Sequence, residues 1–153
     1  LRGRPPELFE ALEPLLDAAY GSYRPLGNFA SSANDEVVMR AYGKPGATLV
    51  FVVLSGVGDG FHQALTRFTD GAWLSTWSMG EGTGLEAPER KLYRQAVAAP
   101  SRKVLAKGIT DLLAAHEARA TALAAAHGPP LPATPTLAGA AEALDGYRDR
   151  VST

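Results

Sequence analysis

Two histidines and a glycine-rich segment are the residues of this chain whose types and spacing could carry chemistry. His62 follows directly after the segment 55–61, SGVGDGF, and His116 lies in a later alanine-rich stretch. A histidine pair with a carboxylate, here Asp59 or Glu117, can bind a metal ion or transfer protons. Glycines after a buried strand can bring backbone amides close to an anion. The predicted ligand-binding residues are Gly56, Gly58, Asp59, Gly60, His62 and His116.

The surroundings of these residues favour a structural role over a chemical one. An anion-binding glycine turn needs a helix after it, whereas residues 61–69 are β-like. Phe61 takes the place of the last glycine of the dinucleotide motif, and His116-Glu117 lacks the second histidine of a zinc-binding H-E-x-x-H. The chain has no cysteine, which excludes thiol catalysis, disulfides and cysteine-bound zinc. We therefore expect a flexible loop and hydrogen-bonded core histidines, with no catalytic residue, metal or cofactor.

A basic stretch is the second feature that could bind a partner. Between residues 90 and 107 there are six basic residues and no acidic ones: Arg90, Lys91, Arg94, Arg102, Lys103 and Lys107. Such a cluster can meet nucleic acid, anionic lipid or an acidic protein surface, although the net charge of −1 makes nucleic acid a weak expectation. The acidic residues near the N-terminus offer a pairing within the chain or between copies; they are Glu7, Glu10, Glu13 and Asp17. A solvated helix face is favoured, and the candidate partner-binding residues are Arg90, Arg94, Arg102, Lys103 and Lys107.

The stretch 61–79, which includes His62, contains both tryptophans and predicts a β-hairpin at Asp70-Gly71. The rest of the fold is expected to be organised around this hairpin. A two-residue turn pairs Phe68 with Trp73, Thr66 with Ser75, Ala64 with Trp77 and His62 with Met79. The aromatic face, with Phe68, Trp73, Trp77 and Met79, is expected in the core. The opposite, more polar face would hold Gln63, Leu65, Arg67, Thr69, Leu74 and Thr76. A three-residue bulged loop would shift the register by one and separate the aromatic residues.

Periodicity and turn residues predict the other elements. Pro5-Pro6 opens a first helix that ends at Gly21, and Pro14 predicts a kink or a restart within it. The runs 37–44 and 47–54 predict a second hairpin, and a strand at 26–30 is left open. The later predictions are helices over 88–99, 101–127 and 136–151, with a proline-rich linker at 128–136.

The order of these elements predicts an α+β fold: an N-terminal helix, a four-stranded, mostly antiparallel sheet of two hairpins, and C-terminal helices packed on one face. The rival is an α/β fold in which 61–69 is a helix. The predicted domain spans 1–127, followed by the linker 128–136 and an amphipathic helix or tail at 137–153. The longest apolar run, 47–54, is short of the ~18 residues of a membrane-spanning helix, and no signal peptide is visible. We expect a soluble, cytoplasmic domain.

The motif T-x-F-x-D-G-x-x-L-x-T resembles a hairpin of uncharacterised bacterial proteins. It consists of Thr66, Phe68, Asp70, Gly71, Leu74 and Thr76, and in those proteins a later helix carries a leucine pair and a histidine, here Leu112-Leu113 and His116. Some of those proteins are membrane-attached. The resemblance implies the hairpin and a bacterial origin, and it implies no activity.

These observations favour a non-catalytic domain that binds a protein partner or itself. In that case, removal of residues 129–153 should leave a folded domain with altered association. The alternative is a small-ligand or anion-binding domain, or an enzyme, that uses the loop 55–61 with His62 and His116. In that case, His62→Ala or Gly58→Val should abolish ligand binding without loss of the fold.

Overall fold

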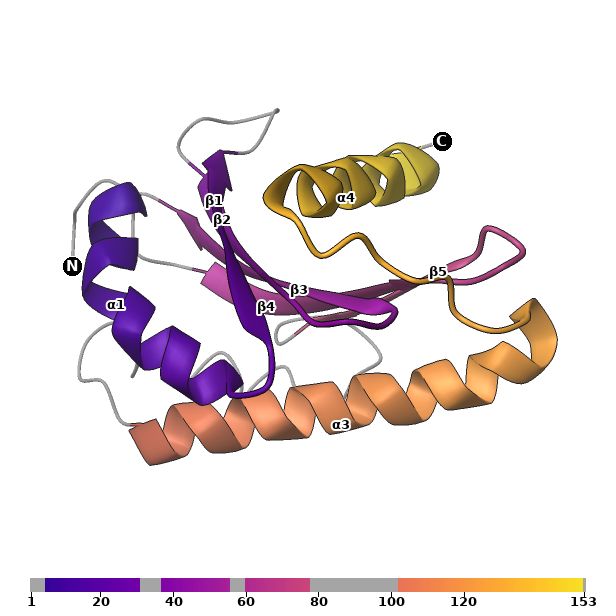
Figure 1. The fold of residues 1–153 in the computed structure, drawn as a ribbon, viewed down its shortest axis with the longest axis horizontal. Coiled ribbons are helices and arrows are strands. Elements are labelled where there is room, and N and C mark those ends of the chain that lie inside the picture. The colour runs from indigo at the N-terminus through magenta and orange to yellow at the C-terminus, as the bar shows by residue number, and fades with distance from the viewer. Residues whose placement is uncertain (1–4, 31–36, 56–59, 78–101, 153) are drawn as a thin grey trace.

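The sheet is a five-stranded antiparallel meander (Figure 1). The structure, a computed structural model, describes residues 5–30, 37–55, 60–77 and 102–152. Its elements are α1 (Pro5–Tyr20), β1 (Arg24–Ala30), β2 (Val37–Gly43), β3 (Thr48–Ser55), β4 (Gly60–Arg67), β5 (Trp73–Trp77), α3 (Arg102–His127) and α4 (Leu137–Ser152). The strands pair in the order β1-β2-β3-β4-β5. The predicted α+β class is confirmed, with five strands instead of four because the segment left open at 26–30 belongs to β1.

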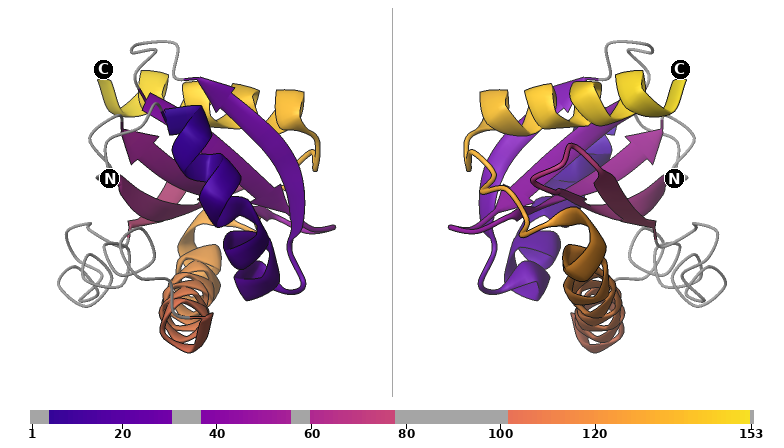
Figure 2. Two further views of the ribbon diagram at one scale, coloured as in Figure 1. Left: turned by 90° about the vertical axis from the view of Figure 1, so that its left-hand side faces the viewer. Right: turned by 90° about the vertical axis from the view of Figure 1, so that its right-hand side faces the viewer.

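Helices cover both faces of the sheet (Figures 1 and 2). α1 and α3 lie on one face, and α4 lies on the other. The core beneath α1 and α3 includes Leu16, Tyr20, Val38, Tyr42, Val50, Val52, Ala64 and Ile109. The core beneath α4 includes Met39, Ala41, Leu49, Phe51, Val53, Leu65, Ala140 and Leu144. The expectation that the C-terminal helices share one face is wrong for α4, because β2 and β3 carry apolar side chains on both faces and each face needs a cover.

The β4–β5 hairpin closes with a three-residue loop instead of the predicted two-residue turn. Phe68 N donates to Ala72 O at 2.8 Å, and Gly71 N donates to Phe68 O at 2.9 Å. Gly71 has a φ of +92°, in the left-handed region that such bulged loops require. The observed strand pairs are Gln63–Trp77, Ala64–Thr76, Leu65–Ser75, Thr66–Leu74 and Arg67–Trp73. The predicted register is therefore wrong by one residue.

This register separates the aromatic residues that were expected on one face. Phe68 is fully buried beside His127 at the end of α3, with 6.0 Å between the ring centroids. Trp73 packs edge-on against Tyr147 of α4 at 5.9 Å. The hairpin is thus tied to both helical layers. At its tip, the Ala72 backbone amide and His127, whose Nδ1 lies 2.7 Å from the carboxylate, lower the pKa of Asp70.

The described helices largely follow the sequence pattern. α1 continues through Pro14 without a restart, and α3 is followed by Gly128 with a φ of +82°. The helix predicted over 88–99 lies outside the described residues. Within the ranges described above, none of the helices combines the length and apolar character needed to cross a membrane.

The segment 128–136 returns the chain past the ends of the strands, so that α4 can cover the second face. Leu131 N donates to Arg67 O, and Ala133 N donates to Gly46 O, each at 2.8 Å. Thr136 caps α4, because its hydroxyl accepts a hydrogen bond from Gly139 N at 3.1 Å. α4 then packs on the sheet through side chains that include Ala140 and Leu144. The docking of the last helix, which could not be inferred from sequence, is thus defined.

Leu144→Ala should destabilise the domain by about 2–5 kcal/mol, because the side chain is 1% exposed beneath α4 and its loss leaves a cavity. The matched change Leu131→Ala, at a side chain that is 37% exposed, should cost about 0.5 kcal/mol or less. Urea unfolding followed by circular dichroism measures both. Equal unfolding midpoints for the two variants would show that α4 contributes no core in solution.

Candidate functional site

His116 lies at the centre of a buried chain of hydroxyl groups. α3 places the imidazole, which is 1% exposed, over β4 and β5. Its Nδ1 lies 2.7 Å from Thr76 Oγ1, and its Nε2 lies 2.8 Å from Thr66 Oγ1. Thr66 Oγ1 in turn lies 2.9 Å from Thr48 Oγ1. A neutral imidazole has one donor and one acceptor nitrogen, and hydroxyl groups satisfy both. Burial lowers the pKa of His116 to about 4, so the ring is neutral at pH 7.

His62 belongs to a separate aromatic cluster. Its Nδ1 lies 2.6 Å from the Tyr20 hydroxyl, and the Tyr20 ring stacks on Tyr42 with 4.2 Å between centroids. Burial lowers the pKa of His62 to about 4 as well. Thr66, the partner of His116, is four positions along β4 from His62, which corresponds to roughly 13 Å at the usual strand rise. The two histidines therefore occupy different hydrogen-bonded groups.

The other residues predicted for ligand or partner binding are only partly described. Gly56, Gly58 and Asp59 lie outside the described residues, and Gly60 opens β4, where it pairs with Leu54 of β3. Of the basic stretch, Arg90 and Arg94 lie outside the described residues, and Arg102 and Lys103 are described only as the backbone that opens α3. Lys107 Nζ forms an exposed ion pair with Asp111 at 2.8 Å. Within the described part of the chain, no group of three histidine or acidic residues could hold a metal ion.

A buried arginine, which the sequence analysis missed, pairs with the acidic face of α1. Arg40 of β2 is 8% exposed; its Nε and Nη2 donate to Asp17 at 3.1 and 2.9 Å, and its Nη1 donates to Glu13 at 3.1 Å. The guanidinium also donates to Asn28 and to the Tyr42 hydroxyl. Burial lowers the pKa of Arg40, but these bonds to Asp17 and Tyr42 outweigh it and raise the pKa above its ordinary value. An arginine inside the apolar run VVMRAY, with acids one helical turn apart, was the available signal.

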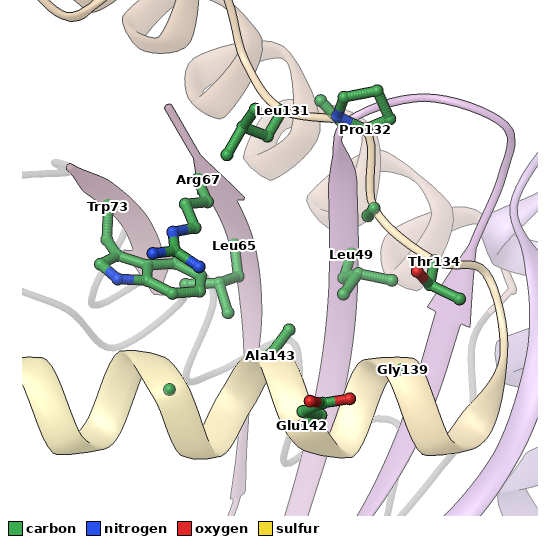
Figure 3. Close-up of a pocket in the computed structure, with 13 residues that line it drawn as sticks. Leu49, Leu65, Arg67, Trp73, Leu131, Pro132, Thr134, Gly139, Glu142 and Ala143 are labelled. Atoms are coloured by element: carbon green, nitrogen blue, oxygen red, sulfur yellow. The ribbon is translucent and has the colours of Figure 1, made fainter. Parts of the chain in front are cut away.

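An open crevice of about 260 Å³ lies on the opposite face, between the sheet, α4 and the segment 131–134 (Figure 3). We call it the Arg67 crevice; it is lined by Leu49, Leu65, Arg67, Trp73, Leu131, Thr134, Glu142 and Ala143, among others. The guanidinium carbon of Arg67 lies 5.2 Å from the centroid of the Trp73 ring, a cation–π contact. Among the described residues, no carboxylate lies within ion-pair distance of Arg67. The crevice thus combines an apolar floor with one oriented cation.

A larger hollow of about 510 Å³ lies on the α1/α3 face, between the end of α1 and the middle of α3. Its polar wall includes Thr48 and His116, both of which belong to the hydroxyl chain described above. Lys44 Nζ lies 4.7 Å from the centre of the Tyr23 ring, and burial and then the charge of Glu117 raise the pKa of the Tyr23 hydroxyl. Like the Arg67 crevice, the hollow thus has a cation on an aromatic ring, but its polar wall differs, because the Thr48 and His116 groups there already belong to one hydrogen-bonded chain.

Comparison of the chain with protein-family models, curated proteins and solved structures finds no match in any of the three. The geometry of the two faces of the sheet is therefore the basis for a functional proposal.

His116→Gln should be less stable than the wild type by about 1–3 kcal/mol at neutral pH, because Thr76 loses its partner. The wild type keeps a neutral His116 whose pKa, about 4, is below the ordinary 6.5. Between these values the unfolded state binds more protons, so the wild-type free energy of unfolding falls as pH falls. The gap between the two proteins should narrow by roughly 2 kcal/mol from about pH 7 to about pH 5. Urea unfolding at both pH values measures it, and a constant gap would contradict a neutral, buried His116.

Asp17→Asn should cost about 1–3 kcal/mol, because it removes the charge that Arg40 and the Tyr42 hydroxyl share in a partly buried site. Asp111→Asn is the matched control: Asp111 also accepts from a basic side chain, Lys107, but that pair is exposed and should contribute about 0.5 kcal/mol or less. Thermal and urea unfolding of both variants test the difference. Similar losses for the two would refute a special role of the Arg40 cluster.

Proposed function

We propose that this chain is a non-catalytic domain that binds a protein partner at the Arg67 crevice. The observation that supports the proposal is the grouping of Arg67, Trp73 and Leu131 around one depression that has an apolar floor. Arginine and tryptophan are among the residue types that most often contribute strongly at protein interfaces. Leu131, at 37% exposure, is the most exposed large apolar side chain in the described ranges, and it lies at the rim of this depression.

The size of the crevice favours part of a protein over a small molecule. Small-molecule sites are typically ~300–1,000 Å³ and largely enclosed, whereas this crevice has about 260 Å³ and is open. An opening of this size suits one or two side chains of a larger partner. The alternative is a small-ligand or anion-binding site that uses the loop 55–61 with His62 and His116. It receives less support because burial keeps both imidazoles neutral, and because the two histidines belong to different hydrogen-bonded groups.

A peptide-library selection on the immobilised domain tests this function. We expect an enriched class of peptides that binds Leu131→Asp about tenfold or more weakly than the wild type, since a charge at the rim opposes apolar contact. The control Ala122→Asp adds the same charge to an exposed position of α3 and should bind like the wild type. If no class is enriched, or if the peptides bind Leu131→Asp as tightly as the wild type, the proposal is wrong.

A further inference from the structure

We infer that the Arg67 crevice recognises an acidic side chain of its protein partner together with a neighbouring aliphatic side chain. Arg67 would take the carboxylate, and the apolar floor would take the aliphatic group. This inference rests on the proposed function, and it adds the chemistry of the segment that the crevice selects.

Arg67 is held in an orientation suited to a carboxylate. It lies on β4 directly across from Trp73 of β5, and the guanidinium stacks over the indole ring. Trp73 is itself fixed by the edge contact with Tyr147 and by α4, where a Cβ on Gly146 would lie 3.6 Å from the indole. Stacking occupies a face of the guanidinium and leaves the N–H groups at its edge, which match the two oxygens of a carboxylate. No described residue supplies that carboxylate within ion-pair distance.

The floor next to Arg67 accepts an aliphatic side chain. Leu49 of β3 and Leu65 of β4 are direct cross-strand partners and form adjacent parts of the lining (Figure 3). Leu131 stands at the rim above them. Leu49 and Leu65 are themselves buried, so an aliphatic group that enters here removes from water mainly the exposed side chain of Leu131 and the half-buried surfaces of Trp73 and Ala143, which favours binding. A carboxylate at Arg67 and an aliphatic group on the floor are therefore neighbours in the bound segment.

The backbone around the crevice favours a side-chain carboxylate over the C-terminus of a peptide. Recognition of a free C-terminus typically uses a nest of unpaired backbone N–H groups. Leu131 N and Ala133 N already donate to Arg67 O and Gly46 O, and Pro132 has no N–H. We therefore assign the carboxylate to an internal aspartate or glutamate of the partner.

Glu142 limits where that acid can lie. It projects from α4 at the wall of the crevice away from Trp73 (Figure 3). A second carboxylate beside it would meet a like charge, and repulsion of this kind contributes to specificity. The bound segment should therefore carry its acid at the Arg67 end and a neutral or basic residue at the Glu142 end.

Titration with three short peptides, followed by NMR of the Arg67 Nε–H and the Trp73 indole N–H, tests the inference. The peptides are acetyl-Gly-Glu-Leu-Gly-amide, its glutamine counterpart, and acetyl-Gly-Gln-Leu with a free C-terminal carboxylate. The glutamate peptide should bind roughly threefold to tenfold more tightly than the other two, a modest factor because Arg67 is exposed. Arg67→Gln should abolish this preference, whereas Arg119→Gln, at an exposed arginine of α3, should preserve it.

Three results would overturn the inference. Equal binding of the glutamate and glutamine peptides, or no binding of either at millimolar concentration, removes the role of the carboxylate. Tighter binding of the free-acid peptide assigns recognition to a C-terminus. If the preference for the glutamate peptide survives Arg67→Gln, the carboxylate binds at a residue other than Arg67. In each case the proposed function still stands if library-selected peptides require Leu131, so the two failures can be told apart.

Discussion

The structure depends on the need to cover both faces of one sheet. Along β3, Leu49, Phe51 and Val53 point to one side, and Val50 and Val52 point to the other, and all five are buried. α1 and α3 can cover only the second set. After α3, the chain must therefore cross from one face of the sheet to the other. The segment 128–136 makes this connection. The Arg67 crevice lies where this connection and α4 meet the strands, so it is a product of the same requirement.

The layer beneath α1 and α3 is held together by polar groups that satisfy one another. Arg40 joins β2 to α1 through Asp17, and His116 joins α3 to β4 and β5 through Thr66 and Thr76. Buried polar groups are costly without hydrogen-bond partners, so such networks specify which helix lies over which strands. Two residue types that suggest chemistry in a sequence, histidine and arginine, here have structural roles on this face.

Much of the fold could be predicted from sequence, whereas the site could not. The periodicity of apolar residues and the positions of turn residues predict α1, β2 to β5, α3 and α4, because these signals are local in the sequence. An apolar stripe shows that one side of α4 is buried, but it does not indicate which face of the sheet the helix covers. Asp70-Gly71 suits both a two-residue and a three-residue loop, and the difference of one residue moves every side chain of one strand to the other face. The predicted register therefore placed Arg67 and Trp73 on opposite faces of the sheet. No pattern in the sequence indicated that Leu131, which is distant along the chain, would lie beside them.

The loop at Gly71 links the turn geometry to the Arg67 crevice. Because Gly71 adopts a left-handed conformation, Arg67 and Trp73 become direct cross-strand partners on the α4 face. A side chain at this position would strain the backbone although no atom lies within 4 Å of its Cβ. With a two-residue turn, Trp73 would lie on the other face of the sheet from Arg67, and the crevice would lack the cation–π pair. The charge that defines the proposed partner is thus positioned by a glycine that lies outside the crevice lining.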